Sequence, residues 1–153
     1  MNPIRIILTD DQADCMMILS STLRDAGFAI TRAYGGEDLV RKVQRLKPDI
    51  VLTDLEMPHF GGVEVIKALK SDPTTQGIPI IAVTSHTWDD LMNSAAIAGC
   101  AGFVAKPFQA ARLIREIERA LASANAIRTE RTESGSGLRL ATDPSFTVGR
   151  TGD

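Results

Sequence analysis

The stretch Ile50-Val51-Leu52-Thr53-Asp54 decides the fold that this chain can adopt. It is an apolar run that ends in one carboxylate, and Leu55-Glu56-Met57-Pro58 and the pair Gly61-Gly62 follow it. A continuous run of branched side chains is typical of a strand buried on both faces of a parallel sheet. Because a buried charge is costly, we expect Asp54 at the carboxyl end of this strand, facing solvent. Ligands of open parallel sheets bind at that end.

Similar apolar runs and helical patterns alternate along the rest of the chain. The runs predict strands at residues 4–9, 28–33, 50–54, 80–84 and 102–106. Apolar residues at helical spacing predict helices at residues 13–26, 35–46, 63–69, 88–98 and 109–123. Parallel strands need crossover connections, so the pattern predicts an α/β, doubly wound, five-stranded parallel sheet with helices on both faces. Right-handed crossovers favour the strand order 2-1-3-4-5.

Composition and charge exclude several classes of protein. A chain of 153 residues predicts one domain with a normal core. The net charge of −2 argues against a DNA-binding face, which needs concentrated basic residues. No apolar run is long enough to cross a membrane, and the N-terminus lacks the apolar core of a signal peptide. Cys15 and Cys100 lack zinc-binding spacing, so we expect reduced thiols in a cytoplasmic protein.

The last part of the chain changes character. We expect a folded domain over residues 1–125 and a polar C-terminal tail over residues 126–153, because the tail lacks an apolar stripe and is too short for a core of its own. Two interpretations of this tail stay open. It is either a flexible segment, or residues 138–141 and 146–148 form a hairpin that docks as an arm on this domain or on a neighbour.

Polar residues follow four of the predicted strands at the same edge of the sheet. Asp10 and Asp11 follow the first strand, Asp54 ends the third, Thr84 ends the fourth and Lys106 ends the fifth. Each has an ordinary explanation when it is taken alone; Asp11, for example, could simply cap the next helix. Together they place three carboxylates, one hydroxyl and one ammonium group around one crevice. That combination is far more specific than any of its parts.

This set of groups suits phosphoryl transfer. Three carboxylates in one crevice repel one another, and a divalent cation would remove that repulsion. Hard oxygen ligands with room for water favour Mg²⁺. Phosphoryl transfer needs positioning and charge neutralisation more than covalent machinery. Asp54 would be the nucleophile, Mg²⁺ and Lys106 would neutralise the phosphoryl oxygens, and the Thr84 hydroxyl would bond to one of them.

The same residues carry a resemblance to a known family. Asp10-Asp11, the stretch from Thr53 to Pro58 with Gly61-Gly62, Val83-Thr84-Ser85 and Lys106-Pro107-Phe108 resemble the receiver domain of two-component response regulators, the CheY-like family. The resemblance covers about residues 4–123 in the right order and spacing.

The resemblance implies a phosphoaspartate at Asp54, with the phosphoryl group supplied by a histidine kinase or a histidine phosphotransfer protein. It implies that Asp11, Asp54 and the backbone carbonyl of Glu56 bind Mg²⁺ (or Mn²⁺), with Asp10 acting through a metal-bound water. It also implies a cis peptide bond before Pro107, which is uncommon among X–Pro bonds.

The resemblance further implies a switch and a downstream protein target. The Thr84 hydroxyl would move toward the phosphoryl group, and Phe103 would turn inward, which would change the face formed by the fourth helix, the fifth strand and the fifth helix. The expected function is that of a stand-alone phosphorelay receiver that signals by altered protein–protein contacts. It would not be an enzyme, although it would catalyse its own phosphorylation and dephosphorylation. Whether it forms a homodimer stays open.

Two alternative functions fit the sequence less well. A haloacid-dehalogenase-like phosphatase also uses an aspartate nucleophile, a lysine and Mg²⁺. Its family needs a second aspartate two residues later, where this chain has Glu56, and places its nucleophile on the first strand rather than the third. A flavodoxin-like cofactor binder would need a phosphate-binding loop after the first strand, where Asp10 and Asp11 stand.

Overall fold

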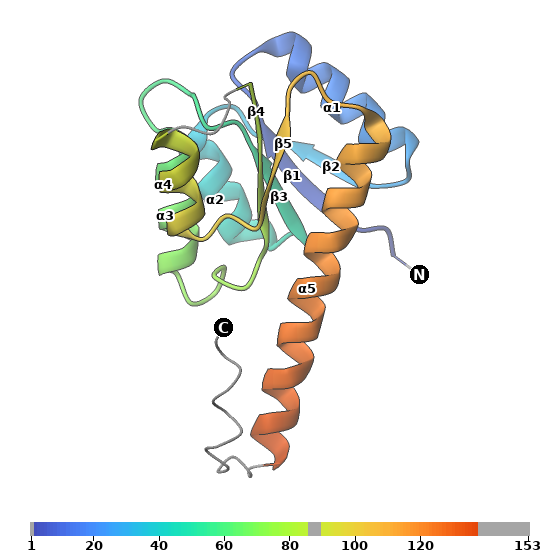
Figure 1. The fold of residues 1–153 in the computed structure, drawn as a ribbon, viewed down its shortest axis with the longest axis vertical. Coiled ribbons are helices and arrows are strands. Elements are labelled where there is room, and N and C mark those ends of the chain that lie inside the picture. The colour runs from blue at the N-terminus through green and yellow to red at the C-terminus, as the bar shows by residue number, and fades with distance from the viewer. Residues whose placement is uncertain (1, 86–89, 138–153) are drawn as a thin grey trace. The chain divides into compact units, whose positions relative to one another are not determined.

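Strands and helices alternate throughout the computed structural model, which describes residues 2–85 and 90–137 (Figure 1). The strands are β1 (Arg5–Thr9), β2 (Ala29–Arg32), β3 (Ile50–Thr53), β4 (Ile80–Thr84) and β5 (Gly102–Ala105). The helices are α1 (Ala13–Asp25), α2 (Gly36–Leu46), α3 (Gly62–Ser71), α4 (Asp90–Ala98) and α5 (Ala110–Gly137). No helix in these two ranges is both long and apolar enough to cross a membrane.

The sheet has the predicted topology. Its five strands are parallel and lie in the order β2-β1-β3-β4-β5. Thr9 at the end of β1 is level with Thr53 at the end of β3, and Thr84 of β4 is level with Ala105 of β5. The residues that follow these strands therefore begin at one edge of the sheet. This register brings the predicted site residues together.

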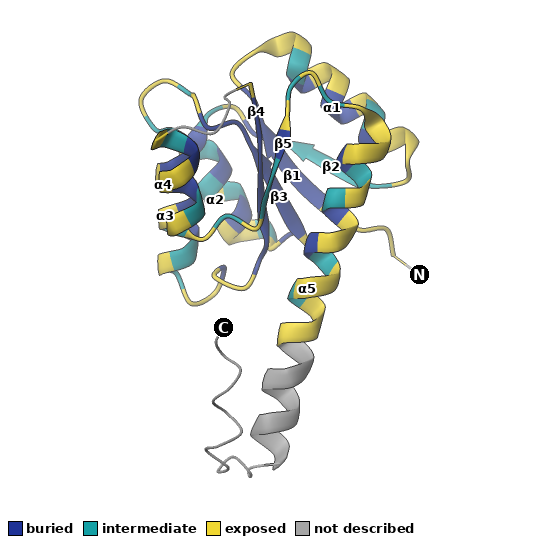
Figure 2. Cartoon of the chain, in the orientation of Figure 1, coloured by how far each residue is buried: buried dark blue, intermediate teal, exposed yellow. Residues whose placement is uncertain are grey.

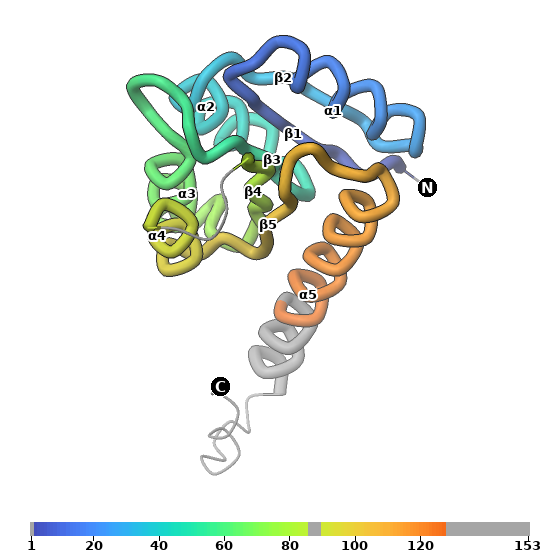
Figure 3. Tube along the Cα trace, turned by 45° about the horizontal axis from the view of Figure 1, so that its top comes forward, coloured from blue at the N-terminus to red at the C-terminus, as the bar shows by residue number. Residues whose placement is uncertain are grey.

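Neighbouring residues of β1, β3, β4 and β5 belong to two separate hydrophobic cores, and Figure 2 shows that β1, β3 and β4 are largely buried. Ile7 and Val51 pack on one face with the apolar sides of α2, α3 and α4. Their sequence neighbours Ile6, Leu8 and Leu52 pack on the other face with α1 and the first turns of α5. Figure 3 shows α1 and α5 on one side of the sheet and α2, α3 and α4 on the other. Burial on both faces explains why the strands read as continuous apolar runs.

The last helix differs from the prediction. The sequence predicts an end at residue 123, whereas α5 continues to Gly137. Ala122, Ala124 and Arg128 belong to residue types with high helix propensity and favour the first part of this extension. The last residues, Ser134 to Gly137, belong to types with low propensity, and the described contacts do not explain why they are helical. Contacts divide the chain into a unit that ends at Leu121 and a unit that starts at Ala122. The predicted hairpin over residues 138–148 and the predicted helix start at 88–89 lie outside the described residues.

Candidate functional site

Asp54 directly follows β3 and is held by the backbone around it. Its N–H donates to the Thr9 carbonyl at 3.3 Å. Its carboxylate oxygen Oδ1 accepts a hydrogen bond from the N–H of Glu56 at 3.2 Å. The side chain is only 10% exposed, so the remaining carboxylate surface faces one opening. The structure therefore places this carboxylate at the carboxyl edge of the sheet, as the apolar run predicts.

Lys106 links the ends of three strands. Its ammonium nitrogen Nζ lies 2.6 Å from Oδ2 of Asp10 and 3.3 Å from Oδ2 of Asp54. The Asp10 side chain is completely buried, and its other oxygen accepts a hydrogen bond from the Gln12 N–H at 2.9 Å. Hydrogen bonds to a charged group are among the strong ones in proteins. β1, β3 and β5 are thus joined at their carboxyl ends by one cation and two carboxylates.

The electrostatics of this cluster favour a further cation. Burial raises the pKa of Asp54; the Lys106 ammonium opposes that effect, and the nearby Asp10 carboxylate adds to it. Burial alone would lower the pKa of Lys106, but its hydrogen bond to Asp10 and the charges of Asp54 and Asp10 raise it overall. Lys106 therefore stays charged, while the negative form of Asp54 is disfavoured. Any additional positive charge near Asp54 would stabilise its carboxylate.

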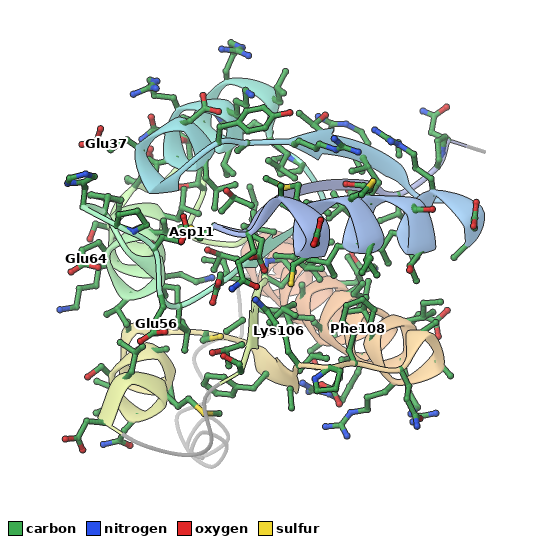
Figure 4. The ribbon with its side chains drawn as sticks, turned by 90° about the horizontal axis from the view of Figure 1, so that it is seen from above. Asp11, Glu37, Glu56, Glu64, Lys106 and Phe108 are labelled. Atoms are coloured by element: carbon green, nitrogen blue, oxygen red, sulfur yellow. The ribbon has the colours of Figure 1, made fainter. Side chains whose placement is uncertain are left out.

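An open cleft of about 900 Å³ gives access to Asp54. Asp11, Glu56 and Lys106 line it together with Asp54. Figure 4 shows the side chains of Asp11, Glu56 and Lys106 near the carboxyl edge of the sheet, each from a different segment of the chain. Asp11 and Glu56 are exposed, whereas Asp54 lies deeper and is buried. The cleft is therefore open to a donor group from solvent.

The lining of this cleft has the donor set that a hard divalent cation needs. Asp11, Asp54 and Glu56 line the same space, and oxygen ligands with room for water suit Mg²⁺. In the described ranges, no group of three acidic, histidine or cysteine side chains could hold a metal ion by itself, and Asp10 pairs with Lys106. The predicted ligand set uses the Asp11 and Asp54 carboxylates with a backbone carbonyl of Glu56 and reaches Asp10 through a water, and it stays a prediction.

The loop after Asp54 is shaped by close packing that only glycine permits. A Cβ atom on Gly62 would lie 2.4 Å from the backbone oxygen of Asp54 and 2.7 Å from the Cα atom of Leu55. The N–H of Gly61 donates to the Glu64 side chain at 3.1 Å, which caps the start of α3. The start of α3 therefore packs directly against the backbone that carries Asp54.

The remaining predicted residues lie at the strand ends and on the strands where the sequence predicts them. Thr84 ends β4 and is buried, and the next residue, Ser85, lines the cleft. Phe103 on β5 is partly buried and packs against the core that includes α4. The Lys106–Pro107 peptide bond is cis. The structure does not show these residues in a second arrangement, so their role as a switch stays a prediction.

Several cleft residues are not among those predicted from the sequence. Gln12, Cys15 and Leu91 also line the cleft. Cys15 lies in the first turn of α1, close in sequence to Asp11, so this proximity could have identified it. Leu91 begins α4, and only the tertiary structure shows that this helix reaches the cleft.

The parallel sheet, the acidic cleft and Lys106 are together typical of one class of signalling protein. Comparison with known proteins identifies the same class. Residues 6–118 match the response regulator receiver domain family. The chain is 32% identical over 117 residues to the chemotaxis protein CheY of Thermotoga maritima, a match covering 75% of this chain and 95% of that protein. The chain belongs to the response regulator receiver domain family. Receiver domains are signalling proteins rather than conventional enzymes.

Further relatives extend this result. The chain is 27% identical over 130 residues to the transcriptional regulatory protein PrrA of Mycobacterium leprae, covering 85% of this chain and 55% of PrrA. The receiver domain of the sensor histidine kinase PA1611 from Pseudomonas aeruginosa PAO1, solved with a magnesium ion in its active-site cleft, matches with a TM-score of 0.75 and 26% identity, covering 79% of this chain and 99% of that domain. Nothing in these comparisons supports the phosphatase alternative.

Proposed function

We propose that Asp54 accepts a phosphoryl group from a phosphohistidine of a histidine kinase or a histidine phosphotransfer protein. The observation that carries this proposal is the contact of Asp54 with Lys106 at 3.3 Å at the base of an open cleft. An oxygen of the Asp54 carboxylate would form the new bond to phosphorus. The bond from phosphorus to the donor's imidazole nitrogen would break, and that nitrogen would then take up a proton.

The groups around Asp54 would each neutralise or orient part of this reaction. Lys106 holds one carboxylate oxygen and would neutralise charge on the incoming phosphoryl oxygens. The Glu56 N–H fixes the other oxygen, so the carboxylate cannot rotate freely. Asp11, Asp54 and the Glu56 carbonyl would hold Mg²⁺ (or Mn²⁺), with Asp10 acting through a bound water. When bound, such an ion would supply charge neutralisation for the transferring group.

The output of this event would be a change of protein contacts. Thr84 ends β4 beside the cleft, and Phe103 packs toward α4. A phosphoryl group adds a charge of about −1.5 to −2, which would draw the Thr84 hydroxyl and let Phe103 move inward. The face formed by α4, β5 and α5 would then bind a downstream protein rather than DNA. This signalling would take place in the cytoplasm. Phosphorylation could also favour a homodimer, which the oligomeric state in solution would show.

Intact-mass spectrometry after incubation with acetyl phosphate tests the phosphoacceptor assignment. We expect the wild type to gain one phosphoryl group in the presence of Mg²⁺, and Asp54→Asn to gain none. Asp49→Asn is the matched control, because Asp49 is an exposed aspartate that precedes the same strand. Persistent labelling of Asp54→Asn would refute the assignment. If no adduct forms at all, beryllium fluoride binding would separate rapid hydrolysis from a receiver that takes no phosphate.

A further inference from the structure

A second cavity, which we call the Tyr34 pocket, adjoins the reaction cleft. It has a volume of about 350 Å³, and Asp10, Tyr34 and Gly35 belong to its own wall. It shares Asp11, Met57, Pro58 and His59 with the cleft that leads to Asp54. The two cavities are therefore neighbours along the loop after β3. A protein that reaches Asp54 through the cleft would come close to the Tyr34 pocket.

Tyr34 presents its ring to solvent on a fixed backbone. The residue is 69% exposed, yet its N–H donates to Oδ2 of Asp38 at 2.9 Å. The next N–H, of Gly35, donates to the Thr9 hydroxyl at 3.2 Å. The Lys42 ammonium lies 5.4 Å from the ring centroid and 3.0 Å from Asp38. A large exposed ring that is already positioned can bind a partner with little loss of conformational entropy.

The part of the wall that the pocket shares with the cleft is also held in one conformation. His59 has a positive φ of 71°, and the Phe60 N–H donates to the Pro58 carbonyl at 2.8 Å. This combination is the mark of a γ-turn, which is rare and strained for a non-glycine residue. Strained backbone of this kind persists where the surrounding structure fixes it, and it concentrates at functional sites. The turn keeps the exposed His59 at the rim of both cavities.

The chemistry of the lining selects a cationic occupant. Asp10 and Asp11 are the acidic residues of the Tyr34 pocket, and its lining includes no lysine or arginine; the Asp10 side chain itself is completely buried. Asp10 is already neutralised by Lys106, whereas Asp11 is exposed. A carboxylate beside an aromatic ring binds a guanidinium or ammonium group through charge and cation–π attraction.

We propose that the Tyr34 pocket receives a basic side chain, arginine or lysine, of the phosphodonor protein. This inference rests on the proposed function, since the donor must reach Asp54 through the adjoining cleft. The basic side chain would lie over the Tyr34 ring and beside Asp11, whose carboxylate would share its charge with the Mg²⁺ of the proposed function, while the donor's phosphohistidine enters the cleft. Tyr34 is thus a specificity residue for protein donors and takes no part in the chemistry of transfer.

Synthetic phosphohistidine peptides test this inference. One set carries a single arginine at successive positions on either side of the phosphohistidine, and a matched set carries glutamine at the same positions. Rates of transfer to the wild type are compared with rates to Tyr34→Ala, Tyr34→Phe and Ile97→Ala, with phosphoramidate as a donor that has no side chain. Ile97 is the matched control because it is an apolar residue of α4, is 80% exposed and lines neither cavity.

We expect at least one arginine peptide to react with the wild type about fivefold faster than the glutamine peptide with the same position changed. A rate ratio of this size corresponds to the free energy of one exposed cation–π contact. Tyr34→Ala should abolish this preference and leave the phosphoramidate rate unchanged, while Tyr34→Phe and Ile97→Ala should keep the preference. The inference is overturned if the wild type prefers no arginine peptide, or if the preference survives in Tyr34→Ala. A wild type that also fails to react with phosphoramidate would count against the proposed function itself.

Discussion

Replacing Lys106 with methionine removes the cation that two buried carboxylates share. At an effective dielectric constant of about 20, opposite charges 2.6 Å and 3.3 Å apart attract by ~6 and ~5 kcal/mol. Much of that attraction only offsets the cost of taking the charges out of water. Removing one partner of a buried ion pair costs ~3–5 kcal/mol, because the other charge stays buried. Since the Lys106 side chain is 13% exposed, we expect a loss near ~3 kcal/mol, the lower end of that range.

Urea unfolding followed by circular dichroism, at neutral pH and with a chelator present, measures this loss. Lys67→Met is the control, because Lys67 is an exposed lysine on α3 and its replacement should change the free energy of unfolding by less than ~0.5 kcal/mol. Adding Asp54→Asn to Lys106→Met should restore part of the lost stability, since one uncompensated charge disappears. Equal midpoints for Lys106→Met and Lys67→Met would refute the view that Lys106 holds the strand ends together.

Three further predictions concern the same site. Folding raises the pKa of Asp54 above its ordinary 3.8, so Asp54 in the folded protein binds a proton at a higher pH than in the unfolded chain. Without metal, Asp54 should therefore make the fold more stable as the pH falls through the raised pKa toward 3.8. Asp54→Asn should remove this pH dependence from the urea midpoints. Gly62→Ala, whose Cβ would lie 2.4 Å from the Asp54 oxygen, should lose ~1–3 kcal/mol and react more slowly with acetyl phosphate; an unchanged midpoint would contradict that packing. Millimolar Mg²⁺ should raise the melting temperature of the wild type, because it binds only the folded state, and a rise of the same size in Asp11→Asn would exclude Asp11 as a ligand.

The sheet could be predicted from sequence because its strands are buried on both faces. β4 spans Ile80–Thr84 as predicted, since an unbroken apolar run follows Pro79. The end of α5 could not be predicted in this way. Apolar periodicity reports only where a helix is packed, whereas α5 continues past Leu121 through residues that carry no apolar stripe.

The residues of the candidate site could be predicted from the sequence, but not all of the contacts between them. Strand order and register were enough to bring Asp54 and Lys106 together. The pairing of Lys106 with Asp10 at 2.6 Å depends on the direction of two side chains, which no spacing in the sequence reveals. The Tyr34 pocket was missed for a similar reason, because its walls come from the loops after β1, β2 and β3.

Borohydride reduction of the phosphorylated protein tests the central claim most directly. Reduction converts an aspartyl phosphate to homoserine, and peptide mapping then locates the altered residue. Trypsin should release the peptide from Leu46 to Lys67, which contains both Asp49 and Asp54. The account predicts homoserine at position 54 and unmodified aspartate at position 49. Homoserine at another aspartate, with position 54 intact, would contradict the assignment of Asp54 as the phosphoacceptor.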